Sequence, residues 1–177
     1  MGMAKVCSVA LVFAALILGA FILADGQEVT ARGDMGGFLT PDGKLTETLE
    51  LQDAQEGFAG LSGEVLTVQP DGTWRIARFL NDRVEEPHRQ GRLDAKELKA
   101  LAGVLAEQDF SELPSVVGQA PEVKPHRITV RFGETSSTLV MQPGQDVPEI
   151  AARQRELSEP QAKLVTIVET TRRLVEH

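Results

Sequence analysis

The side chains that could act as metal ligands or acid-base groups are few and scattered along the chain. The three histidines are His88, His126 and His177, and their spacings match no zinc motif. A metalloprotease helix would carry two histidines four residues apart with an adjacent glutamate, and the sequence contains no such pair. We therefore predict that the protein holds no metal ion and uses no cofactor.

Two segments come near to known catalytic motifs. Glu85, Glu86 and His88 could supply oxygen and nitrogen ligands, but their charged neighbours are typical of a solvated loop. Residues 60–64 almost match the Gly-x-Ser-x-Gly turn of hydrolases, yet Glu64 stands where the second glycine is required. We predict that the protein is not an enzyme, and an enzyme that uses Glu85, Glu86 and His88 is the alternative.

A glycine-flanked aromatic residue is the best candidate for a binding role. Loops that bind partners often project one large side chain, because that side chain can fill a pocket of the partner. Aromatic side chains also pack in cores, so Phe58 either projects from its loop or folds back beneath the sheet. The predicted partner-binding residues are Glu56, Gly57, Phe58, Ala59 and Gly60.

Length and composition fit one globular domain of ordinary character. The chain has 177 residues, of which 42% are hydrophobic and 25% charged, so it has enough apolar residues to form a core. Its formal net charge is -8. An acidic balance argues against nucleic acid as a partner, because affinity for phosphates depends on lysine and arginine.

The first residues are typical of an export signal. Lys5 is the single charged side chain before Asp25, and residues 6–24 are all apolar or small. This segment is either a signal peptide cleaved after residue 24 or a membrane anchor, since it is also long enough to cross a bilayer. Both interpretations predict an exported protein: periplasmic, secreted, or anchored to the outer face of the cytoplasmic membrane. Contact with a membrane is expected only through this segment, and a cleaved chain loses Cys7, its one cysteine.

The remaining residues predict a spacer over 25–44 and a single domain over 45–177. Residues 126–132 alternate strictly between apolar and polar side chains, which is typical of a strand with one buried face. Asp94 and Ser158 each precede a glutamate or glutamine by three residues, the spacing of a helix capping box. We expect strands over residues 45–51, 64–69, 73–79, 126–132 and 137–141. Residues 53–63 should form a flexible connection, and residues 81–93 should contain a short hairpin. Helices are expected from Asp94, over residues 148–157 and from Ser158.

This order of elements predicts an α+β fold. The strands form an antiparallel sheet of two hairpin-like units, and two or three helices pack on one face of it. The fold has to be stable through core burial alone, because a cleaved chain has no cysteine for disulfides.

The arrangement of motifs resembles the emfourin family, small bacterial proteins of the protealysin-inhibitor type that inhibit thermolysin-like zinc metalloproteases. The likeness covers about residues 45–174 and includes the run 56–60 between two strands, the helix over 93–105 and the later hairpin over 128–141. Asp109-Phe110, Leu113-Pro114 and Val147-Pro148 continue it. The chain departs from the family at Glu56, where a glycine is usual, and in the insertion over 74–93.

The resemblance implies a protein that binds a secreted metalloprotease through residues 56–60. The alternative is a membrane-anchored envelope module that contacts an unknown partner through the same loop. Both hypotheses describe an extracytoplasmic protein-binding domain.

Overall fold

The structure is a computed structural model that describes residues 37–119 and 124–176. The predicted export segment 1–24, with Cys7, lies outside these residues, as does the predicted spacer up to residue 36. Among the described residues, no helix combines the length and the apolar character needed to cross a membrane. The described residues all belong to one compact unit of the chain.

The described strands form one sheet with the order β4-β3-β2-β1-β7-β8-β6, and β5 pairs with β3 beside β4. Neighbouring strands are antiparallel, except that β6 runs parallel to β8. The strands are β1 (Leu49–Gly57), β2 (Gly60–Val68), β3 (Thr73–Leu80), β4 (Arg83–Val84), β5 (Arg89–Arg92), β6 (Val116–Val117), β7 (His126–Phe132) and β8 (Thr135–Met141).

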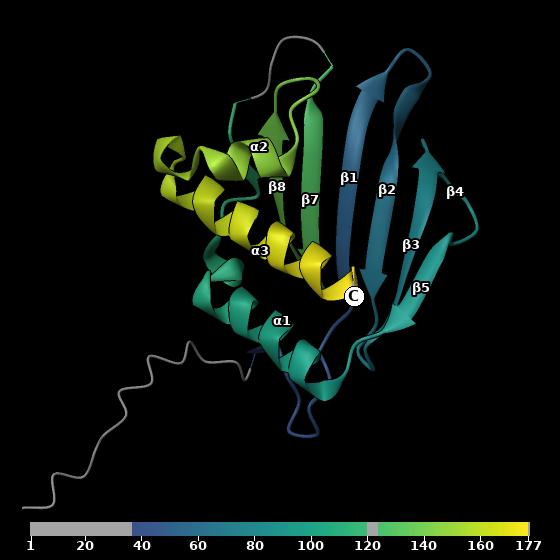
Figure 1. The fold of residues 1–177 in the computed structure, drawn as a ribbon, viewed down its shortest axis with the longest axis vertical. Helices are drawn as coiled ribbons and strands as arrows, with labels where there is room; N and C mark the ends of the chain where they lie inside the picture. The colour runs from purple at the N-terminus through teal and green to yellow at the C-terminus, as the bar shows by residue number, and fades with distance from the viewer. Residues whose placement is uncertain (1–36, 120–123, 177) are drawn as a thin grey trace, which may run out of the picture. The chain divides into compact units, whose positions relative to one another are not determined.

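The helices α1, α2 and α3 lie on one face of this sheet (Figure 1). The described helices are α1 (Ala95–Glu107), the short 3-10 helix η2 (Phe110–Glu112), α2 (Val147–Ala152), the short 3-10 helix η3 (Gln154–Glu156) and α3 (Glu159–Val175). The α+β fold, with a mostly antiparallel sheet covered by helices on one face, is therefore confirmed.

Both predicted capping boxes start helices. Asp94 Oδ1 accepts a hydrogen bond from the backbone of Glu97 at 2.8 Å, and Glu97 Oε2 accepts one from the backbone of Asp94 at 2.7 Å. At the start of α3, the backbone N–H of Ser158 donates to Gln161 Oε1 at 3.0 Å. These bonds satisfy N–H groups that the first turn of a helix leaves free.

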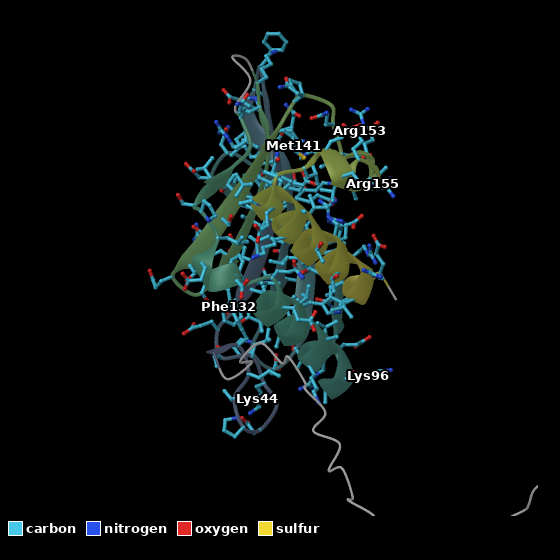
Figure 2. The ribbon with its side chains drawn as sticks, turned by 90° about the vertical axis from the view of Figure 1, so that its left-hand side faces the viewer. Lys44, Lys96, Phe132, Met141, Arg153 and Arg155 are labelled. Carbon is cyan, nitrogen blue, oxygen red and sulfur yellow. The ribbon has the colours of Figure 1, made fainter. Side chains whose placement is uncertain are left out.

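The core lies between the helices and the sheet. Strand residues on the helix-facing side are buried, and the predicted apolar stripe of α3 packs against them. The stripe consists of Leu164, Ile167, Val168, Thr171 and Val175, all of which are buried. The side view in Figure 2 shows Phe132 and Met141 toward opposite ends of the sheet. His126, the first residue of β7, pairs with Met141.

The hairpin formed by β1 and β2 is longer than the sequence predicts. Residues 53–63 were expected to be a flexible connection, but all of them except the turn are paired strand. Strand β7 pairs with β1 and β3 pairs with β2, so hydrogen-bond partners on both sides hold these polar and glycine-rich residues extended. The flexible connection was therefore a wrong prediction, because tertiary pairing outweighs local strand propensity.

The ordered unit also begins before residue 45, the boundary predicted from the sequence. Phe38 is buried and meets the ring of Phe132 edge-on, with 5.3 Å between the centroids. Leu39 forms a bridge with Leu45. The last part of the predicted spacer thus packs on the end of the sheet.

Candidate interaction surface

Phe58 stands at the tip of the β1–β2 hairpin. Gly57 pairs with Gly60, which leaves Phe58 and Ala59 at the turn. Gly60 has a φ of +109°, a conformation that residues with a Cβ atom rarely adopt. The Phe58 side chain is 100% exposed, so the interpretation that it folds back beneath the sheet is wrong. In Figure 1 this turn joins the end of β1 to the start of β2 at the top of the view.

Asn81, the residue after β3, fixes the turn from one side. Its backbone N–H donates to the carbonyl of Leu61 at 2.6 Å. Its side-chain Oδ1 accepts from the backbone of Leu61 at 3.0 Å, and Nδ2 donates to the carbonyl of Ala59 at 3.3 Å. Three hydrogen bonds from one residue therefore hold the second half of the turn.

The segment before β7 contacts the turn from the other side. Gln55 Nε2 donates to the carbonyl of Lys124 at 2.8 Å, and the backbone of Glu56 donates to the carbonyl of Pro125 at 3.4 Å. The Lys124 ammonium lies 3.1 Å from the centroid of the Phe58 ring. A cation over the face of an aromatic ring is attracted by its quadrupole, so this contact orients the exposed ring.

A cluster of charged side chains joins the middle of β1 to α3 and to the segment after β8. Asp53 of β1 accepts a hydrogen bond from Arg172 of α3 through Oδ2. Its Oδ1 lies 2.5 Å from Nε2 of His126, the first residue of β7. The other ring nitrogen of His126, Nδ1, lies 2.6 Å from the carbonyl oxygen of Gln145.

The neighbours of Asp53 and His126 shift both groups toward their charged forms. Burial by itself raises the pKa of Asp53, but the hydrogen bond with His126 and the charge of Arg172 outweigh it and hold the pKa below its ordinary value. The hydrogen bond with Asp53 raises the pKa of His126, and it outweighs the opposing effect of burial. The lowered pKa of Asp53 and the raised pKa of His126 are the two shifts expected when a carboxylate and an imidazolium form an ion pair.

The predicted site residues 56–60 thus lie at one turn and at the two strand ends that flank it. Among the described residues, no ion pair links Glu85 or Glu86 to His88. Glu85 and Glu86 are exposed, and His88 Nε2 lies 3.4 Å from Glu64 Oε1 instead. Ser62, the serine of the near-match to the hydrolase motif, lies within strand β2 rather than on a turn before a helix. Within residues 37–119 and 124–176, no group of three His, Cys, Asp or Glu side chains could hold a metal ion.

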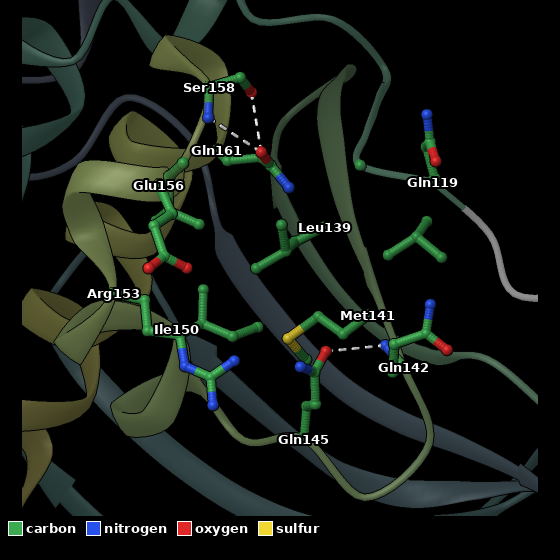
Figure 3. A pocket seen from close by; sticks show the side chains of 13 residues that line it. Gln119, Leu139, Met141, Gln142, Gln145, Ile150, Arg153, Glu156, Ser158 and Gln161 are labelled. Carbon is green, nitrogen blue, oxygen red and sulfur yellow. Dashed lines mark hydrogen bonds between the residues drawn. The ribbon is translucent and has the colours of Figure 1, made fainter.

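A pocket of about 580 Å³ lies between β8, α2 and the start of α3 (Figure 3). Leu139, Met141 and Ile150 form part of its lining. Its described lining contains one carboxylate, Glu156, and no histidine, so it offers no pair of groups for acid-base chemistry. The amide groups of Gln145 and Gln161, which also line it, accept hydrogen bonds from neighbouring residues.

No protein-family model matches this chain, and a search of curated proteins finds no match. The likeness to emfourins therefore stays a prediction.

Asp53, His126, Arg172 and Asn81 are not among the site residues predicted from the sequence. The alternation of side chains along β7 was one signal for His126. It lies two residues before the buried Ile128, so both side chains point to the face of the sheet that the helices cover. A polar residue on a buried face requires hydrogen-bond partners, and this requirement points to a cluster. Asp53 carries the same signal, because it alternates in step with the buried Leu49 and Leu51 of β1, whereas nothing in the local sequence marks Arg172.

Proposed function

We propose that this protein is a non-enzymatic, extracytoplasmic protein-binding domain that inserts Phe58 into an apolar pocket of its partner. The single observation that supports the proposal is a fully exposed phenylalanine on a turn that hydrogen bonds hold from both sides. A side chain that is already oriented loses little conformational entropy on binding, which favours its use as an anchor.

We further propose that the partner is a thermolysin-like zinc metalloprotease, which makes the protein an inhibitor. The resemblance of residues 45–174 to emfourins supports the class of partner, and the position of residues 56–60 at one accessible tip is compatible with insertion into a cleft. The full chain, added in stoichiometric amounts, should reduce the activity of such a protease. A protease that stays fully active at excess of the protein would contradict the inhibitory role.

A second candidate function is a membrane-anchored envelope module with a different protein partner. Residues 6–24 favour it, because an apolar segment of this length suits a retained anchor as well as a signal peptide. Mass spectrometry of the native N-terminus separates the two cases. An intact end at Met1 or Gly2 supports the anchored module, whereas a chain that begins near Asp25 supports the exported inhibitor.

A further inference from the structure

Both ring nitrogens of His126 face hydrogen-bond acceptors. Nδ1 lies 2.6 Å from the backbone carbonyl of Gln145, and Nε2 lies 2.5 Å from Asp53 Oδ1. A neutral imidazole has one N–H, whereas the imidazolium has two. Only the protonated ring can therefore donate to both partners at these distances.

The charged groups around the His126 ring come from two elements. Asp53 approaches from β1, and Arg172 approaches from α3 and bonds the second oxygen of the same carboxylate. Met141 of strand β8, an apolar residue, pairs with His126, and the segment after β8 contributes the Gln145 carbonyl. The His126 side chain is 13% exposed, so solvent screens these interactions only in part.

The His126 ring is connected to the Phe58 turn through the two residues that precede it. Gln55 pairs with His126 across the strands, and the Gln55 side chain donates to the carbonyl of Lys124. The backbone of Glu56 donates to the carbonyl of Pro125. The ammonium of Lys124 then lies over one face of the Phe58 ring. The position of His126 therefore determines where the segment over 124–125 meets the hairpin.

We infer that His126 is a positioning residue that holds the Phe58 hairpin in its binding conformation only as the imidazolium, so that partner binding weakens when alkaline pH removes its proton. This inference rests on the proposed function of Phe58, whose regulation it describes.

The neutral ring would lose the contact with Gln145. A hydrogen bond to a carboxylate is stronger than one to a neutral carbonyl, so the remaining proton stays on Nε2 and points to Asp53. The lone pair of Nδ1 then faces the lone pairs of the Gln145 carbonyl, and these two atoms repel each other. Residues 124–126 move away from the segment after β8, which weakens the bond from Glu56 to Pro125 and removes Lys124 from Phe58.

The first test follows the full chain by NMR as pH rises and requires no partner. The amide of Glu56 should lose protection from hydrogen exchange by roughly tenfold, after correction for the intrinsic exchange rate, at the pH where the His126 ring titrates. The amide of Leu61, which bonds to Asn81 on the other side of the turn, is the internal control and should keep its protection. Unchanged protection of Glu56 across the titration of His126 would overturn the inference.

Two variants distinguish a protonation effect from a general structural one. Asp53→Asn removes the group that favours the imidazolium, so the pH midpoint of the Glu56 change should fall. Arg172→Gln removes a cation that disfavours it, so the midpoint should rise. His88→Gln changes a histidine elsewhere on the sheet and should leave the midpoint as it is. Shifts of the first two variants in the same direction, or a shift with His88→Gln, would refute the role of His126.

The second test measures binding of the full chain to a thermolysin-like protease at several pH values. Binding should weaken with the midpoint seen by NMR, and His126→Gln should remove that dependence, after correction for the pH profile of the protease itself. Binding with the same affinity above and below the midpoint would overturn the inference but leave the proposed function intact. The absence of binding at every pH would contradict the proposed partner, while the NMR results would still support the positioning role.

Discussion

The side chain of Asn81 occupies the space that a Cβ atom would need at Gly60. Asn81 Oδ1 lies 2.0 Å from the ideal Cβ position, far inside van der Waals contact. The same oxygen accepts the hydrogen bond from Leu61, so it cannot move away without loss of that bond. The shape of the Phe58 turn therefore depends on the glycine that follows the turn and on the asparagine that follows β3.

We predict that Gly60→Ala distorts the turn and destabilises the protein, whereas Gly57→Ala does not. At Gly60 the new Cβ meets Asn81 and the positive φ adds strain, so the free energy of unfolding should fall by about 1–3 kcal/mol. At Gly57 the nearest atom would be 3.7 Å away, an ordinary contact, and the change should stay within about 0.5 kcal/mol. Urea unfolding followed through the single tryptophan, Trp74, measures both. Equal stability of the two variants would show that Asn81 does not constrain the turn.

Gly63 should tolerate substitution even less, because its neighbour is backbone. A Cβ atom at Gly63 would lie 1.8 Å from the carbonyl oxygen of Asp53, so β1 and β2 would have to separate. We expect Gly63→Ala to lower the free energy of unfolding by at least about 2 kcal/mol. Ser62→Ala changes the exposed preceding residue and serves as the control. A melting temperature for Gly63→Ala equal to that of the control would contradict the close approach of these strands.

The stability of the protein should depend on pH through Asp53 and His126. The pKa of His126 is raised, so its contribution is complete below the ordinary value of 6.5 and is lost as pH rises through the higher folded pKa. The pKa of Asp53 is lowered, so its contribution is present above 3.8 and is lost as pH falls through the lower folded pKa.

Urea unfolding at a series of pH values checks these directions. The wild-type protein should lose stability on the alkaline side, and His126→Gln should lose less there because it has no proton to release. His88→Gln should follow the wild-type curve and serves as the control. An alkaline decline of the same size in His126→Gln would mean that another group causes it.

Features of the fold that depend on neighbours in the sequence could be predicted. Strict alternation identified β7, and the spacing of Asp94 to Glu97 located the start of α1 because a capping box is a local structure. The extent of the β1–β2 hairpin could not be predicted this way. Its polar residues are held extended by strands β3 and β7, and local propensity does not report such pairing.

The cluster of Asp53, His126 and Arg172 could not be predicted for a related reason. Asp53 lies 73 residues from His126 and 119 residues from Arg172 along the chain, so no spacing rule connects them. The exposure of Phe58 was also undecided, since its flanking glycines allow the ring to turn inward or outward. The contacts of Asn81 and Lys124, both distant in sequence, determine the outward position.

Titration of a thermolysin-like metalloprotease with the full chain and two variants tests the proposed role of Phe58 as the binding anchor. Phe58→Ala should weaken inhibition by at least about tenfold without lowering the free energy of unfolding, because the ring is 100% exposed and contributes little to folding. Val116→Ala removes another exposed apolar side chain, 60% exposed at the β6 edge, and should inhibit like the wild-type protein. A wild-type chain that leaves the protease fully active would contradict the inhibitory function, and a Phe58→Ala variant that inhibits as strongly as wild type would contradict the role of Phe58.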